Sequence, residues 1–177
     1  MTVDRIGNLK AAENKVLEDV NTLLTEVRSI VAAAPKSATE GVALLSQLRD
    51  IGYEDLNQIQ HEYLILAAAT WLVEKGLVPS DAEWYWHPRQ TGGSDEPDLC
   101  AKHEGRTVLS AEITTSRRPI GTILDRMRTT LAKLKGLPGK KCYFVRTESM
   151  SSKAKTIVSA EGWKIKVVCL PHVAGEL

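Results

Sequence analysis

Residues 96–114 predict a β-hairpin that brings two carboxylates together. Two apolar stretches are separated by Glu104-Gly105, a pair that favours a tight turn. A hairpin closed over residues 104–106 places Asp98 opposite Glu112, or one residue away. Opposed residues have Cβ atoms about 5 Å apart, so the two carboxylates repel unless a divalent cation or a shared proton lies between them. We therefore expect a metal site at this hairpin.

Alternation along the second strand of the hairpin places Glu112 on one face with Ser110 and Thr114. Ala111 and Ile113 lie on the other face, which should pack against a helix. A lone carboxylate is costly on a strand that is otherwise suited to burial. Mg²⁺ takes hard oxygen ligands such as carboxylates and retains water for chemistry, so the expected cofactor is Mg²⁺ or Mn²⁺.

Composition and length indicate one globular domain. The 177 residues are sufficient for a hydrophobic core, and 43% of them are hydrophobic. No apolar run approaches the roughly 20 residues of a membrane span, and the first residues lack the apolar core of a signal peptide. We therefore expect a cytoplasmic protein that does not contact a membrane. The three cysteines form no CxxC pair, which favours small buried residues over a zinc site.

Charge is distributed unevenly along the chain. Residues 1–98 contain 8 Lys and Arg against 16 Asp and Glu, whereas residues 99–177 contain 15 against 6. A basic half beside a carboxylate pair suits a polyanionic substrate held over a metal. The alternative is a solvated surface whose charge the acidic half neutralises.

Helical patterns dominate the first 76 residues. Apolar residues at three- and four-residue spacing predict a helix over residues 9–33. Ser37 begins a second helix, for which Gly52 is the expected stop, and Asn57 caps a third helix that ends at Gly76. The first two helices lack a basic face, so we expect them to pack on the core or to form a dimer interface.

The order of elements from residue 57 predicts an α/β domain. A helix is followed by three strands, and then by a helix, a strand, a helix and a final strand. Strand–helix–strand steps require right-handed crossovers, which place parallel strands on one side of a mixed sheet.

This pattern resembles the PD-(D/E)xK nuclease superfamily. The matching residues are Pro97-Asp98 and, after an interval of 13 residues, Glu112-Ile113-Thr114. The resemblance implies a restriction-endonuclease-like mixed β-sheet core flanked by helices over residues 57–177. Residues 1–56 would be an N-terminal helical extension.

The resemblance also implies roles for individual residues. Asp98, Glu112 and the backbone carbonyl of Ile113 would be metal ligands. Glu62, on the preceding helix, would be an additional catalytic acid or else a solvated helix residue. Thr114 occupies the position of the catalytic lysine, which leaves the expected positive charge to come from elsewhere. The candidate nucleic-acid-binding cations are Arg117, Arg118, Arg126 and Lys133.

The expected function is Mg²⁺-dependent hydrolysis of phosphodiester bonds, with DNA as the expected substrate. Cleavage of both strands needs two sites, which predicts a homodimer. Because Thr114 lacks a charge, the alternative is an inactive nuclease-fold subunit that binds nucleic acid or a partner protein. A third hypothesis is a protein-interaction module formed by the N-terminal helices.

Overall fold

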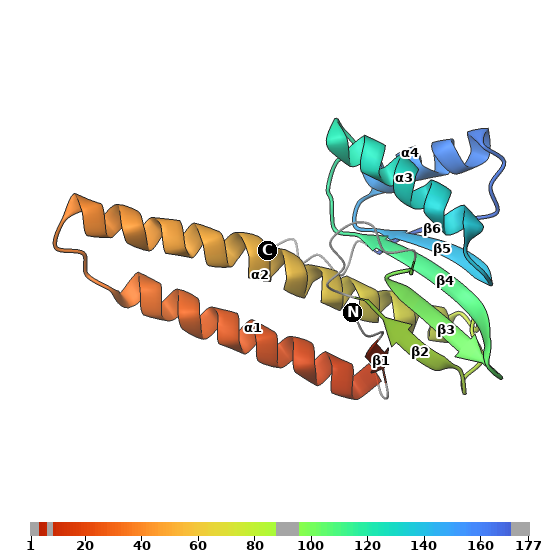
Figure 1. The fold of residues 1–177 in the computed structure, drawn as a ribbon, viewed down its shortest axis with the longest axis horizontal. Coiled ribbons are helices and arrows are strands. Elements are labelled where there is room, and N and C mark those ends of the chain that lie inside the picture. Colours follow the sequence, from red (N-terminus) through yellow and green to blue (C-terminus); the bar gives the residue numbers. More distant parts are fainter. Residues whose placement is uncertain (1–3, 7–8, 88–95, 171–177) are drawn as a thin grey trace.

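The computed structural model describes residues 4–6, 9–87 and 96–170, as an α/β arrangement of one sheet and four helices (Figure 1). Its elements, in chain order, are β1 (Asp4–Ile6), α1 (Leu9–Ala32), α2 (Ala38–Glu74), β2 (Glu83–Trp86), β3 (Leu99–His103), β4 (Arg106–Thr114), α3 (Thr122–Gly136), β5 (Lys140–Val145), α4 (Glu148–Ala160) and β6 (Lys166–Cys169).

The sheet is mixed, as its element order predicts. Its six strands lie in the order β1-β2-β3-β4-β5-β6. The pairs from β1 to β4 are antiparallel, and β4, β5 and β6 are parallel. Strand β1 was not expected from the sequence, because three residues are too short to show a period. Because β4, β5 and β6 are parallel, their carboxyl ends lie at one edge of the sheet, which is also where β3 begins.

The hairpin of β3 and β4 closes over two residues, so the expected three-residue turn is wrong. Glu104 and Gly105 both have positive φ, 50° and 73°, which is the backbone of a type I′ turn. Arg106 pairs with His103 instead of lying in the turn. A β-bulge then shifts the register between Ala101 and the next pair. The bulge restores the expected alignment at the far end of the hairpin.

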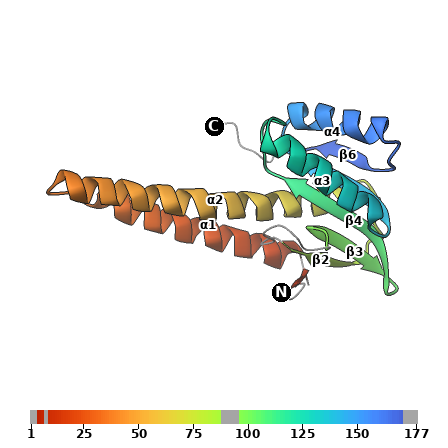
Figure 2. The ribbon, with the colours of Figure 1, turned by 45° about the horizontal axis from the view of Figure 1, so that its top comes forward.

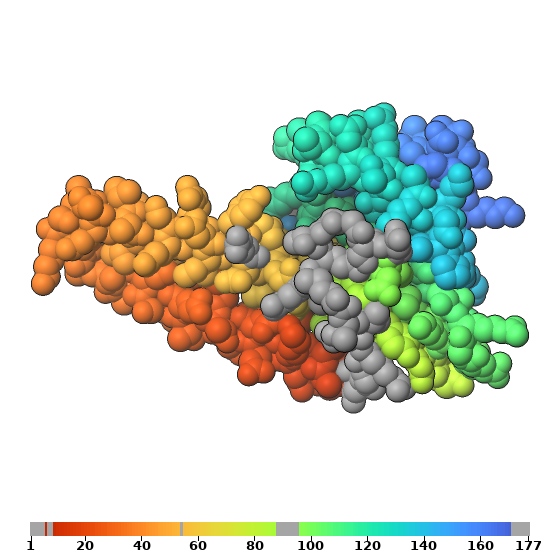
Figure 3. All heavy atoms as spheres, viewed as in Figure 1, coloured from red at the N-terminus to blue at the C-terminus, as the bar shows by residue number. Residues whose placement is uncertain are grey.

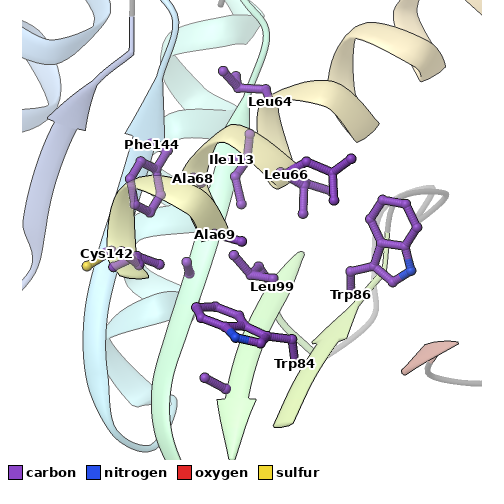
Figure 4. Close-up of a cluster of buried hydrophobic side chains, with 14 of the residues drawn as sticks. Leu64, Leu66, Ala68, Ala69, Trp84, Trp86, Leu99, Ile113, Cys142 and Phe144 are labelled. Carbon is purple, nitrogen blue, oxygen red and sulfur yellow. The ribbon is translucent and has the colours of Figure 1, made fainter. Parts of the chain in front are cut away.

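Helices cover both faces of the sheet. The second half of α2 packs its apolar side chains on the face that carries Leu99, Ile113 and Phe144 (Figure 4). On the opposite face, α3 and α4 enclose a second cluster around Tyr143 and Val145. The faces of β4 therefore divide as expected: Ala111 and Ile113 face α2, whereas Glu112 faces α3 and is only 6% exposed.

Helix α2 is continuous, so the expected stop at Gly52 and the expected cap at Asn57 are wrong. Glycine inside a helix costs about 1 kcal/mol relative to alanine, which good helix formers on both sides can offset. Asn57 donates its side-chain amide to the Tyr53 carbonyl within the helix. The boundary expected between residues 56 and 57 thus falls inside one helix.

Helix α1 and the first half of α2 project from the sheet as a two-helix arm (Figures 2 and 3). We define the arm as residues 17–57. None of its described side chains is fully buried, because two helices alone cannot enclose the residues between them. In the described part of the chain, no helix is long and apolar enough to cross a membrane.

Candidate metal and nucleic-acid site

Asp98 and Glu112 lie opposite each other at the edge where the parallel strands end. Leu99 pairs with Ala111, and one further step along the same register places Asp98 opposite Glu112. Both side chains are buried, with 7% and 6% of their residue surface exposed. The juxtaposition expected from the sequence is confirmed at the level of register. Two carboxyl groups are thus enclosed where charge is poorly solvated.

Asp98 is fixed by two contacts. Its Oδ2 atom accepts a hydrogen bond of 2.7 Å from the backbone N–H of Ile113. The Nε2 atom of His61, on α2, lies 3.5 Å from the same oxygen. Charged hydrogen-bond acceptors that bond to backbone N–H groups are held firmly in position. Asp98 is therefore oriented by its own hairpin and by the helix above it.

The backbone of Ile113 is directed toward the same side of β4 as Asp98. In an antiparallel ladder, one residue directs both its N–H and its C=O toward the same neighbour. The register extended by two places sets Pro97 opposite Ile113. Proline has no N–H, so it cannot donate to the Ile113 carbonyl as another residue would. The Pro-Asp dipeptide thus suits the use of this carbonyl as a cation ligand.

Glu112 has a raised proton affinity. Burial, and next the charge of Asp98, raise the pKa of Glu112 to about 7. Lys133, on α3, opposes this rise because its Nζ atom lies 2.7 Å from Oε1 of Glu112. Lys133 also donates a hydrogen bond of 2.8 Å to the carbonyl of Glu96. Burial and the repulsion from Asp98 therefore outweigh the attraction of Lys133 for the ionised form of Glu112.

Lys133 places a positive charge where Thr114 provides none. The Thr114 hydroxyl instead accepts a hydrogen bond of 3.4 Å from the backbone N–H of Ser116. The sequence singled out Lys133 only as one of several candidate cations. Its contact with Glu112 depends on how α3 docks on the sheet, which no local pattern specifies.

Glu62 is fully buried, so the alternative of a solvated helix residue is wrong. Its Oε2 atom lies 3.0 Å from Nζ of Lys15 on α1, and its Oε1 atom accepts from Gln58 at 3.3 Å. Lys15 also pairs with Asp19. The contact with Lys15 connects Glu62, on α2, to α1. His61, which the sequence analysis did not select, is the α2 residue that reaches Asp98.

Two of the three expected phosphate-binding arginines lie at this edge. Arg117 and Arg118 follow the carboxyl end of β4 and are exposed, and Arg126 is exposed on α3. Thr147 donates a hydrogen bond of 2.8 Å to the backbone carbonyl of Arg117. That bond ties the segment after β4 to the start of α4. The guanidinium groups remain accessible to an anion.

The donor set fits a hard divalent cation, although it is small. Two carboxylates and one backbone carbonyl are the oxygen ligands that Mg²⁺ accepts, with water completing the octahedron. The burial of two opposed carboxyl groups is the observation that favours such an ion. Within the described ranges, no group of three or more His, Cys, Asp and Glu side chains is arranged to hold a metal. A cation here would therefore depend on the opposed pair and the backbone.

Comparisons with protein-family models, with curated proteins and with solved structures found no match.

Proposed function

We propose that this protein is a Mg²⁺- or Mn²⁺-dependent nuclease of the PD-(D/E)xK type that hydrolyses phosphodiester bonds in DNA. The observation that carries the proposal is the burial of two opposed carboxylates, Asp98 and Glu112, at the edge where the parallel strands end. Lys133 supplies a positive charge beside this pair, which Thr114 does not. The proposal also draws on Arg117 and Arg118, which follow the carboxyl end of β4.

Each residue has a distinct part in the proposed reaction. Asp98, Glu112 and the Ile113 carbonyl would hold the cation. When bound, such an ion lowers the pKa of a water and offsets charge on a phosphate. Lys133 donates hydrogen bonds to the attacking water and balances charge on the phosphate oxygens. Arg117, Arg118 and Arg126 contact the nucleic-acid backbone. Glu62 acts through its contact with Lys15, by positioning α1 against α2.

Plasmid cleavage tests this proposal. The wild-type protein should nick or linearise plasmid in Mg²⁺ or Mn²⁺ and should be inactive in EDTA. Asp98→Asn should lose the activity, since it removes one charge while keeping the shape of the side chain. Lys135→Gln is a control on α3, because Lys135 lies over the Trp163 ring instead of beside Glu112. Equal cleavage by wild type and Asp98→Asn, or none with either metal, contradicts the proposal.

The second candidate function is an inactive nuclease-fold subunit that binds nucleic acid. The ion pair of Lys133 with Glu112 favours it, because an ammonium group already neutralises one carboxylate without a metal. This candidate predicts DNA binding that is insensitive to Mg²⁺ and to Asp98→Asn. The nuclease proposal predicts instead that the protein cleaves DNA, and that removal of Mg²⁺ or the Asp98→Asn substitution abolishes cleavage.

The proposed nuclease acts as a homodimer, and the arm provides a surface for this. Leu17, Leu24 and Val31 are exposed on α1 at intervals of seven residues. These three residues form an apolar stripe centred on Leu24. In a dimer whose two α1 helices run antiparallel, Leu24 contacts Leu24 of the second copy, and Leu17 contacts Val31. The part of α1 in the arm, residues 17–32, is about 24 Å long, so a face about 20 Å wide covers on the order of 500 Å² per chain, at the small end for a specific interface. Two such arms form a four-helix bundle.

A further inference from the structure

Arg146 stands at the carboxyl end of β5, one residue beyond Val145. The side chain is half-buried, and its Nη1 atom donates a hydrogen bond of 3.2 Å to Oε1 of Gln60 on α2. Gln60 directly precedes His61, which contacts Asp98. The sequence did not single out Arg146. The fold brings it to the same edge as the carboxylate pair, through adjacent residues of one helix.

A second guanidinium group approaches Arg146. Burial, and next the positive charge of Arg117, lower the pKa of Arg146. The hydrogen bond from Thr147 to the Arg117 carbonyl holds the two chain segments together. Two like charges on neighbouring chain segments repel each other, and an anion between them relieves the repulsion.

No acidic group in the described part of the chain forms an ion pair with Arg146, Arg117 or Arg118. By contrast, Arg49 pairs with Asp50, and Arg128 pairs with Asp125. The nearest acidic residue in sequence, Glu148, is exposed in the first turn of α4, and it contributes, after burial, to the raised pKa of Cys169. Arg146, Arg117 and Arg118 therefore form a positively charged cluster that is open to an external anion.

The position of the cluster agrees with ligand binding. In α/β sheets, ligands bind beyond the carboxyl ends of parallel strands. The cluster lies at such an edge, since Arg117 follows β4 and Arg146 follows β5, its parallel neighbour. The positive N-terminus of α4 lies next to Arg146 and adds to the field.

We propose that Arg146 and Arg117 together bind one phosphodiester of a nucleic-acid backbone, beside the Asp98–Glu112 pair. The choice of ligand rests on the proposed nuclease function. A guanidinium group matches two phosphate oxygens with two parallel N–H donors. Glu112 lies two residues before the end of β4, which is roughly 7 Å of strand. The site therefore binds a phosphate near the bond to be cleaved.

Duplex binding without metal tests the inference. Fluorescence anisotropy with a labelled 16-bp DNA duplex in EDTA, over a range of KCl concentrations, gives both the affinity and its salt dependence. Arg146→Gln should weaken binding about tenfold and reduce the slope of log K against log[KCl] by about 0.9, one phosphate contact. Arg146→Lys should retain the slope, because it keeps the charge. Arg49→Gln, the same charge change in the arm, should match the wild type.

An unchanged affinity and slope in Arg146→Gln overturns the inference, as does wild-type protein that does not bind the duplex. Should Arg146→Gln fail to fold, Arg117→Gln replaces it, since Arg117 is exposed, with the same expected loss of slope. The nuclease proposal fails separately. If the wild type does not cleave DNA, and Arg146→Gln lowers the salt dependence of binding, the protein has the phosphate site but not the catalytic activity. A protein that cleaves, with Arg146→Gln at wild-type slope, has the catalysis without this site.

Discussion

Lys133 Nζ lies 2.7 Å from Oε1 of Glu112, which joins a helix residue to the buried acid of a central strand. The two residues come from elements that pack face to face, α3 and β4. The positive charge that the resemblance places at residue 114 thus has a counterpart on α3. Although Thr114 is uncharged, the carboxylate pair has a cationic side chain beside it, that of Lys133.

Replacing Lys133 separates metal binding from catalysis. Lys133→Gln should lower the rate of DNA cleavage about 100-fold, because it removes a donor directed at the charge that develops on phosphate. The same variant should bind Mn²⁺ at least as tightly as the wild type, since the ion no longer competes with an ammonium group. The checks are cleavage rates in saturating Mn²⁺ and calorimetric titration. Lys135→Gln should behave as wild type, and equal cleavage by Lys133→Gln would remove Lys133 from the reaction.

The raised pKa of Glu112 predicts a pH-dependent stability of the metal-free protein. Native Glu112 keeps its proton to about pH 7, whereas the ordinary value is 4.5. Between these pH values the native state binds more protons than the unfolded state, so the free energy of unfolding falls as pH rises. The fall should be on the order of 1–3 kcal/mol. Urea unfolding in EDTA at pH 5, 6 and 7.5 measures it, and Glu112→Gln should remove it. Parallel curves for the two proteins would contradict the assigned pKa.

Two glycines should respond in opposite ways to alanine. Gly139 has φ +76°, and a Cβ atom there would lie 2.5 Å from the carbonyl carbon of Val108, beside the bulge of β4. Gly139→Ala should therefore destabilise the protein by about 2 kcal/mol. Gly52 lies inside α2, and a Cβ atom added there would meet nothing within 4 Å, so Gly52→Ala should stabilise the protein by about 0.5–1 kcal/mol. Urea midpoints measure both, and destabilisation by Gly52→Ala would contradict a continuous α2.

The arm should control oligomeric state. Light scattering on a sizing column should give twice the chain mass for the wild type, and Leu24→Glu should give the monomer because it buries a charge at the centre of the interface. Val73→Glu places the same change at an exposed position of α2 outside the arm, and it should leave the dimer intact. A monomeric wild type, or dissociation by Val73→Glu alone, would exclude the arm as the interface.

The hairpin pair was predictable because it depends on local rules. The sequence predicted Asp98 opposite Glu112 because Gly105 lies midway between them. The structure has this alignment, but it results from a two-residue turn combined with one β-bulge. The mixed sheet followed from element order. The sequence did not predict that α2 continues through Gly52. The helix propensity of the neighbouring residues outweighs the cost of one glycine.

Contacts between distant elements were not predictable from local patterns. Lys133 reaches Glu112, and Arg146 meets Gln60, only because α3 and α2 dock at particular angles on opposite faces of the sheet. His61 carried no ligand spacing in the sequence, yet its position on α2 brings it to Asp98. Glu62 showed the reverse: the sequence suggested a site acid or a solvated residue, and the structure places its carboxylate against Lys15.

The central claim is that the Asp98–Glu112 pair binds a divalent cation. Calorimetric titration of Mn²⁺ into the wild type and into Asp98→Asn, at pH 8 and low ionic strength, tests it most directly. We expect a single ion per chain for the wild type and at least a tenfold weaker association for Asp98→Asn. No binding by the wild type, or equal affinity in the two proteins, would contradict metal binding by this pair.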